Sequence, residues 1–119
     1  MSATLEAFSS EIAAIVARAE ASIVSVQSRR SLASGFMWKK GLIVTSDEAL
    51  PEDGDLTVTL RGGQAVPARR AGRDPTTDIA LLRVEAADAA PPAALSKTTP
   101  KTGELAVAVA ARGGQAHAA

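Results

Sequence analysis

The sequence predicts an all-β fold, an antiparallel sandwich or barrel, preceded by one helix. Three observations support this prediction. Apolar residues follow a helical spacing only before residue 21, and from residue 22 onward the chain divides into about seven short segments of alternating or β-branched apolar residues. Turn residues, mainly Gly, Pro and Asp, separate most of these segments at intervals of about eight to twelve residues. The length of 119 residues suits one domain with a single core.

An N-terminal helix is predicted from Thr4 to Glu20. Its apolar residues recur at the spacing of one helix face, namely Leu5, Phe8, Ile12, Ile15 and Val16. We expect this stripe to pack across one end or side of the sheet as ordinary core. A role in contacts with other subunits is the alternative.

Three strands are predicted next, and a hairpin follows them. The three strands cover residues 23–28, 34–38 and 42–46, with a tight turn at Lys39-Lys40-Gly41 before the third. Residues 56–61 alternate between apolar and polar side chains, and Gly62-Gly63 turns the chain into a strand over residues 64–71. Because Pro67 has no N–H to donate, this returning strand should lie at an edge or contain a bulge.

The last two strands are predicted over residues 79–84 and 104–110. Between them, the Ala- and Pro-rich residues 85–103 should be irregular and exposed. The pentapeptide RGGQA occurs at residues 61–65 and again at 112–116. Each copy follows an apolar strand, so turn formation explains both.

The composition excludes several classes of function. Thirteen basic and thirteen acidic residues cancel, so no overall charge attracts nucleic acid or anionic lipid. No apolar run approaches the ~18 residues of a membrane span, and no export signal is recognisable. The absence of cysteine excludes disulfides, thiolate catalysis and Cys-based zinc sites. His117, the single histidine, lies near the end and is expected to be exposed rather than catalytic.

Several segments carry a family resemblance in their order and spacing. They are ASIVSVQS (residues 21–28), SGF (34–36), GLIVTS (41–46), TVTL (57–60) and, most specifically, GRDPTTDIALLRV (72–84). Together they resemble the first half of trypsin-like serine proteases of the HtrA/Deg type, over roughly residues 5–110. The resemblance implies a six- to seven-stranded antiparallel Greek-key barrel, the first of two. Residues 1–21 would then be a helix packed on the barrel, residues 22–111 the barrel, and residues 112–119 a tail or the start of a second barrel.

The resemblance also assigns two site residues. Asp78 matches the aspartate of the family's Ser-His-Asp triad, and Glu48 occupies the position of the histidine. The serine belongs to a glycine-rich loop of the second barrel, and nothing in these residues resembles that loop. A glutamate with an ordinary pKa of ~4.3 is too weak a base, by roughly two units relative to imidazole, to take the proton of the serine near neutral pH. Two close carboxylates should also raise the pKa of one of them.

The carboxylates allow two other interpretations. Glu48 and Asp78 could hold a hard cation, because such metals favour carboxylate oxygen, or both could simply be solvated or hydrogen-bonded. The neighbouring acids Asp47, Glu52, Asp53 and Asp55 are predicted to be turn and cap residues, because their spacing does not match a calcium-binding loop. No cofactor is expected.

The leading hypothesis is therefore a catalytically inactive N-terminal half of an HtrA/Deg-type protease, kept as a binding or structural module. One alternative is part of a longer serine endopeptidase whose second barrel carries the nucleophilic serine, and another is a metal-binding pseudoprotease. An isolated half should expose the apolar face between the barrels. We expect a second copy, or a C-terminal fragment of the same gene product, to cover that face. The protein should be cytoplasmic if Met1 is the native start, and periplasmic if an export signal was removed.

Overall fold

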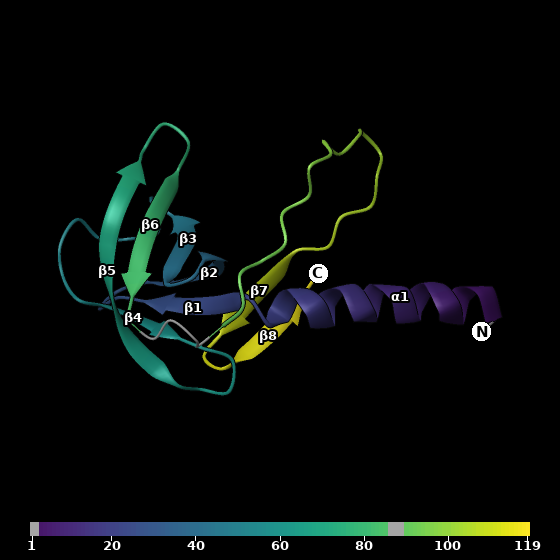
Figure 1. The fold of residues 1–119 in the computed structure, drawn as a ribbon, viewed down its shortest axis with the longest axis horizontal. Coiled ribbons are helices and arrows are strands. Elements are labelled where there is room, and N and C mark those ends of the chain that lie inside the picture. The colour runs from purple at the N-terminus through teal and green to yellow at the C-terminus, as the bar shows by residue number, and fades with distance from the viewer. Residues whose placement is uncertain (1–2, 86–89) are drawn as a thin grey trace.

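Six antiparallel strands close into a barrel in the computed structural model, which describes residues 3–85 and 90–119 (Figure 1). Neighbouring strands follow the order β1-β2-β3-β6-β5-β4. β4 lies beside β1, outside the β1-β2-β3 meander, which is the Greek-key order. The strands are β1 (Ile23–Gln27), β2 (Leu32–Lys39), β3 (Leu42–Ser46), β4 (Leu56–Thr59), β5 (Ala65–Asp74) and β6 (Ile79–Val84). The predicted all-β barrel with one N-terminal helix is confirmed.

The barrel interior is filled by aliphatic side chains. Alternate residues of each strand point inward, as the two-residue period of a strand requires. The side chains with the least exposure include Val24, Val26, Met37, Ile43, Val58, Leu60 and Leu82. Phe36 and Trp38 are only partly buried and Phe8 is exposed, so the core is built without aromatic side chains in the described residues.

The predicted irregularity at Pro67 has a clear structural basis. Pro67 pairs with Thr57 of β4, whereas the pairing of β5 with β6 begins only at Ala68. Pro67 therefore has a strand neighbour on one side only. Because β6 does not pair with it, its missing N–H leaves no carbonyl of β6 without a hydrogen-bond donor. A bulge between Arg70 and Gly72 shifts the register of β5 further along.

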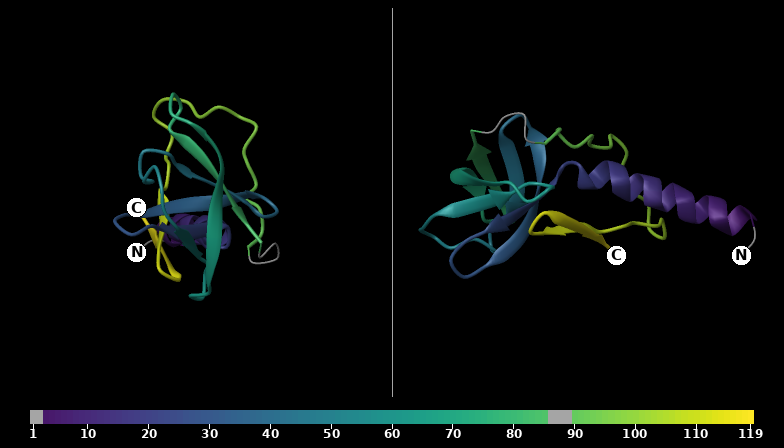
Figure 2. Two further views of the ribbon diagram at one scale, coloured as in Figure 1. Left: turned by 90° about the vertical axis from the view of Figure 1, so that its left-hand side faces the viewer. Right: turned by 90° about the horizontal axis from the view of Figure 1, so that it is seen from below.

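The helix does not pack as predicted. α1 (Ala3–Glu20) has no buried residue, and Figures 1 and 2 show it projecting from one end of the barrel. Its attachment lies at the C-terminal end, where Glu20 forms a 3.4 Å ion pair with Arg61. The apolar stripe identified in the sequence is therefore not part of the barrel core. Within the described residues, no helix is long and apolar enough to cross a membrane.

The C-terminal region also differs from the prediction. The strand expected over residues 104–110 begins only at Val109. Residues 115–118, expected to belong to a tail or to the start of a second barrel, form a strand as well. β7 (Val109–Arg112) and β8 (Gln115–Ala118) form a separate two-stranded hairpin. Residues 90–103 are irregular and mostly exposed, as predicted, and residues 104–108 continue this connection, seen as the long green loop in Figure 1. Residues 86–89 of the predicted connection lie outside the described residues.

Both copies of RGGQA form hairpin turns, which confirms the turn interpretation. The first connects β4 with β5, and the second connects β7 with β8. The two turns also touch, since the N–H of Gly62 donates to the carbonyl of Gly114 at 3.2 Å. A Cβ on Gly114 would lie 2.5 Å from the backbone nitrogen of Gly63, so the contact depends on glycine.

Candidate functional site

The pairing of β3 with β6 brings the two predicted site positions together. Ser46, the last residue of β3, lies opposite Ile79, the first residue of β6. Asp78 immediately precedes β6 and Glu48 follows β3 by two residues, so both lie at the same end of this strand pair. The backbone N–H of Asp47 also donates to the carbonyl of Asp78 at 3.3 Å. The site is thus built from positions about 30 residues apart in the chain, as the resemblance implied.

Both carboxylate oxygens of Asp78 accept hydrogen bonds. The Ser46 hydroxyl donates to Oδ2 at 2.7 Å, and the backbone N–H of Glu48 donates to Oδ1 at 2.7 Å. Asp78 has a φ of 58°, which lies in the left-handed region that aspartate tolerates better than most residues. The backbone therefore presents this carboxylate toward the end of β3.

These two hydrogen bonds favour the ionised form of Asp78. The bond from the Ser46 hydroxyl, followed by the bond from the Glu48 backbone N–H, holds the pKa of Asp78 below its ordinary value. The expectation that two close carboxylates would raise a pKa is not met at Asp78. The reason is that Glu48 approaches Asp78 with a main-chain donor, which favours the ionised carboxylate.

The side chain of Glu48 is exposed. Within the described residues, its carboxylate has no hydrogen-bond or ion-pair partner. The role of Ser46 as a donor to Asp78 was not predicted from the sequence. No spacing motif marks a serine that happens to end a strand opposite an aspartate.

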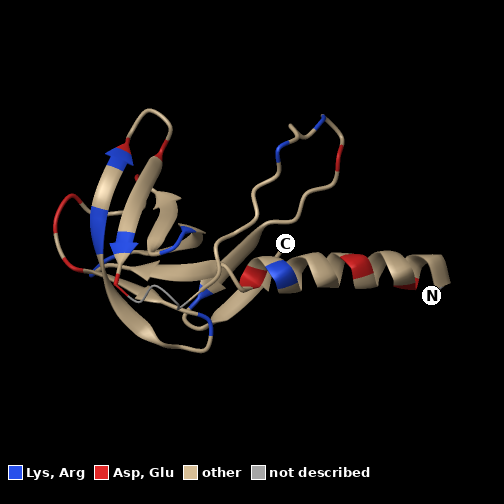
Figure 3. Cartoon of the chain, viewed as in Figure 1, with Lys and Arg blue, Asp and Glu red and all other residues tan. Residues whose placement is uncertain are grey.

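Two arginines of β5 hold the acidic loop that carries Glu48, residues 47–55. Arg73 donates through Nε and Nη2 to Oδ2 of Asp47 at 3.2 and 2.8 Å, and through Nη1 to Glu52 at 2.8 Å. Arg70 donates to the carbonyls of Pro51 and Glu52 at 2.8 and 3.2 Å. Figure 3 shows the acidic loop beside the basic positions of β5.

Asp47 is therefore more than the turn residue predicted from the sequence. Its side chain is only 5% exposed, and its Oδ1 has no hydrogen-bond partner in the described structure. A buried carboxylate is costly unless it is paired, so the ion pair with Arg73 fixes the start of the loop. The pair anchors the backbone directly before Glu48.

A shallow groove of about 460 Å³ lies beside Asp78. Its walls come from β1, β2, β3, β6 and β7, and they are mainly apolar. The lining residues are Ile23, Ser34, Gly35, Phe36, Val44, Thr45, Ser46, Asp78, Ile79 and Val109. The β7 wall is fixed because the Ser34 hydroxyl donates to the carbonyl of Ala111 at 3.2 Å and accepts from its N–H at 3.0 Å. The groove thus ends at an ionised carboxylate.

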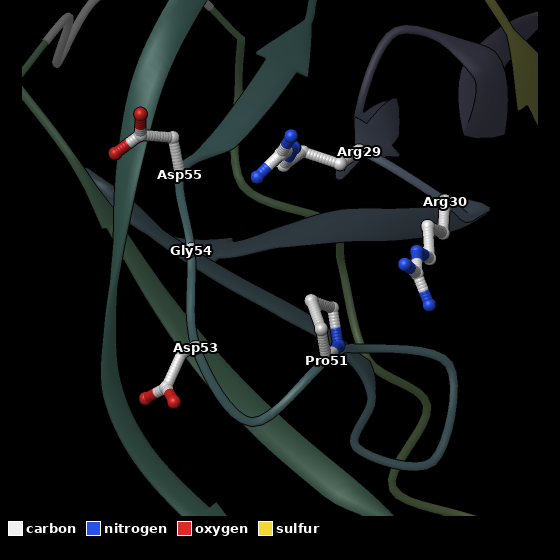
Figure 4. Close-up of a pocket in the computed structure, with 6 residues that line it drawn as sticks. All are labelled: Arg29, Arg30, Pro51, Asp53, Gly54 and Asp55. Atoms are coloured by element: carbon white, nitrogen blue, oxygen red, sulfur yellow. The ribbon is translucent and has the colours of Figure 1, made fainter.

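A second cavity of about 440 Å³ lies between the β1–β2 turn and the acidic loop. Arg29 and Arg30 form one side of it, and residues 51–55 form the other (Figure 4). The side chain of Asp53 points away from the two arginines in this view. Within the described residues, no ion pair connects the arginines with Asp53 or Asp55.

The remaining predicted candidates lie apart from this chemistry. His117 is exposed on β8, opposite Ala110 of β7. In the part of the chain that the structure describes, no group of three or more His, Cys, Asp or Glu side chains is placed to hold a metal ion. Glu48 and Asp78 would be the entire carboxylate set of a cation site, and both oxygens of Asp78 already accept hydrogen bonds.

Known proteins resemble this chain in sequence and in structure. Residues 33–119 match the trypsin-like peptidase domain family. A probable periplasmic serine endoprotease, DegP-like, from Pseudomonas fulva (strain 12-X) is 38% identical over 60 residues, which are 50% of this chain and 12% of that protein. A protein of the same description from Chlamydia pneumoniae is 40% identical over 45 residues, which are 38% of this chain and 9% of that protein.

The crystal structure of Rv3671c from M. tuberculosis H37Rv, a serine-to-alanine mutant in an inactive form, superposes with a TM-score of 0.77. It is 27% identical and covers 87% of this chain, which spans 50% of that chain. The chain therefore spans about half of its structural neighbour and a smaller share of the curated relatives it matches. The DegP-like relatives support the HtrA/Deg type. The family match over residues 33–119, together with the closed barrel, shows that this chain belongs to the trypsin-like peptidase domain family.

Proposed function

We propose that this chain is the N-terminal barrel of an HtrA/Deg-type protease that no longer hydrolyses peptides and serves as a binding or structural module. The observation that carries the proposal is the hydrogen bond from the backbone N–H of Glu48, the residue that the resemblance assigns to the histidine position, to Asp78. Asp78 accepts two hydrogen bonds, whereas the group that would move the proton is a carboxylate.

The chemistry of the triad explains why this replacement matters. The base must accept a proton from serine and return it to the leaving amine near neutral pH. A carboxylate with an ordinary pKa of ~4.3 holds that proton too weakly. The Asp78 carboxylate is already stabilised by Ser46 and the Glu48 N–H, so its charge needs no imidazolium. The pair therefore works as a structural anchor between β3 and β6.

The test of inactivity uses the intact product of the gene. It is incubated with a fluorophosphonate probe and, separately, with an unstructured protein substrate at neutral pH. We expect neither labelling nor cleavage from the natural protein. Where a second barrel is present, Glu48→His should restore labelling, whereas the matched control Glu52→His, on the same loop with a side chain 79% exposed, should not. Labelling of the natural protein at a serine would overturn the proposal.

A second candidate is an active serine endopeptidase that uses an altered base. It is favoured by the intact hydrogen bonding of Asp78 and by the fact that this chain spans half of a solved relative. The same experiment separates the two candidates. Fluorophosphonate labelling that disappears when one serine of the intact product becomes alanine supports the enzyme.

The groove beside Asp78 is proposed to be covered by a protein partner, a second barrel of the same gene product. Its apolar walls and the 42% exposure of Ile79 support a covered surface. A dye that fluoresces on apolar surface should bind the 119-residue chain, and Ile79→Glu should lower that binding. The control Leu32→Glu, with 47% exposure outside the groove, should not change the groove signal. In the intact product the effect of Ile79→Glu on dye binding should vanish.

The alternative partner is a second copy of this chain, which would cover the same groove. In that case the 119-residue chain should associate in solution, and Ile79→Glu should dissociate it in light-scattering measurements. A covered groove is contradicted if Ile79→Glu lowers dye binding equally in the isolated chain and in the intact product, and if the isolated chain does not associate.

A further inference from the structure

The apolar stripe of α1 has the spacing of a coiled-coil seam. Four of its residues, from Leu5 to Ile15, are spaced three, four and three positions apart, and Ala19 in place of Val16 continues this a/d pattern of a heptad repeat. We define the seam as Leu5, Phe8, Ile12, Ile15 and Ala19. The barrel leaves much of it in water, since Phe8 is 46% and Ile15 is 48% exposed. A helix gains most of its stability from packing such a face, so this seam is suited to another helix.

Two charges beside the seam favour one orientation for that helix. Glu11 and Arg18 both lie at g positions, one heptad apart. Within residues 3–85 and 90–119, neither has an ion-pair partner. In a parallel pair, g faces e of the other helix, and Glu11 would meet Val16. In an antiparallel pair, g faces g, so Glu11 of each copy meets Arg18 of the other.

The sizes of the seam residues support the same antiparallel register. That register places Phe8 of one copy against Ala19 of the other, and Ile12 against Ile15. A large side chain thus meets a small one, as interdigitated packing requires. Two-fold symmetry repeats each contact, so the surface is complementary to itself.

A groove at the base of α1 offers space for the large residue. It has a volume of about 630 Å³ and lies between the C-terminal end of the helix and residues 91–95. Ala19 and Ile15 form part of its wall, with Phe36 of β2 behind them. The predicted position of Phe8 of a second copy, against Ala19, is at this groove.

We propose that a second copy of this chain docks antiparallel along α1, with Phe8 of each copy in the groove at the base of the other helix. Glu11–Arg18 ion pairs between the copies fix the orientation. The groove at the base of α1 shares Ile23 and Phe36 with the groove beside Asp78 but does not include Asp78 itself. The proposal does not depend on whether the protein is catalytic.

The test is a charge exchange followed by light scattering or sedimentation equilibrium over a concentration series. The 119-residue chain should approach twice its 12.1 kDa mass as concentration rises. Glu11→Arg and Arg18→Glu should each weaken dimerisation by about tenfold, because symmetry introduces two like-charge contacts. The double variant Glu11→Arg/Arg18→Glu should recover the original affinity.

Matched controls keep the result specific to the seam. Glu6→Arg reverses a charge on the same helix away from the seam and should leave the dimer unchanged. Phe8→Asp should abolish it, with circular dichroism used to show that the barrel remains folded. A strict monomer at all concentrations overturns the proposal. So does a dimer that both charge reversals leave intact, or one that only Ile79→Glu dissociates.

Discussion

The backbone N–H of Glu48 donates a 2.7 Å hydrogen bond to Oδ1 of Asp78, and the Ser46 hydroxyl occupies Oδ2 at the same distance. The positions that the resemblance assigns to the histidine and aspartate of the triad are therefore joined through the main chain. This bond survives the replacement of the side chain at position 48, because any residue except proline supplies the same donor. The closure of β3 on β6 is thus independent of catalysis.

Asp78 should make stability depend on pH at the acidic end. Its pKa in the folded protein is lowered, first by the Ser46 hydroxyl and then by the Glu48 N–H. Its contribution is therefore present above the unfolded-state pKa and is lost as pH falls through the folded-state pKa. Asp78→Asn removes the charge, and asparagine tolerates the same positive φ. The difference in Tm between the two proteins should be largest near neutral pH and shrink as pH falls below about 4. An equal difference at pH 3 and pH 7 contradicts this account.

Gly35 should not tolerate a methyl group. A Cβ there would lie 2.8 Å from the carbonyl oxygen of Val44 and 2.9 Å from Cγ2 of Ile43. Gly35→Ala should therefore lower the free energy of unfolding by about 1–3 kcal/mol, because the neighbouring strand must move. The control is Gly72→Ala, where a Cβ has no neighbour within 4 Å. Denaturant titration should show little change for Gly72→Ala, and equal effects of the two substitutions would contradict the prediction.

Asp47 should matter more to stability than the more exposed acid bound by the same arginine. Arg73 pairs with both Asp47 and Glu52, whose side chains are 5% and 79% exposed. Asp47→Ala leaves the arginine unpaired on its buried side and creates a void, whereas Glu52→Ala removes a solvated pair that contributes little. Thermal unfolding should show a Tm several degrees lower for Asp47→Ala and nearly unchanged for Glu52→Ala. A larger loss of Tm for Glu52→Ala than for Asp47→Ala would show that the loop is anchored elsewhere.

Gly114 should hold the C-terminal hairpin against the barrel. Its added Cβ would meet the backbone of Gly62 and Gly63 at 2.5 to 3.1 Å, and backbone atoms cannot move aside as a flexible side chain can. Gly114→Ala should separate the two turns and break the Gly62 N–H···O=C Gly114 bond. Amide exchange measured by NMR should become faster at Gly62, while Ile43 in the barrel core keeps its protection. Unchanged exchange at Gly62 would show that the turns do not depend on this contact.

Sequence patterns among neighbouring residues predicted most of the strands well. The predicted bounds of the strands over residues 42–46 and 79–84 agree with β3 and β6, since alternation and flanking turn residues are properties of adjacent positions. The predicted C-terminal strand over residues 104–110 was largely wrong, because an apolar, Ala-rich run specifies no partner. Only the pairing of Val109 with Ala118 shows which residues become a strand.

The candidate site was likewise predicted only in part. The resemblance placed Glu48 and Asp78 near each other, and the structure brings these positions together. The Ser46 donor and the Asp47–Arg73 pair were not predicted, because their partners lie 32 and 26 residues away and no local motif links them. Whether Glu48 acts in catalysis stays a prediction for the labelling experiment.

The sequence by itself determined the helix, the strand segments and the acidic residue at position 48, because each depends on the chemistry of neighbouring residues. The tertiary structure decided which face of the helix stays in water, which donors hold Asp78 ionised and how the two RGGQA turns meet. These outcomes depend on distances between segments far apart in the chain. Such distances are set by barrel closure and strand register, which no local pattern of residues specifies.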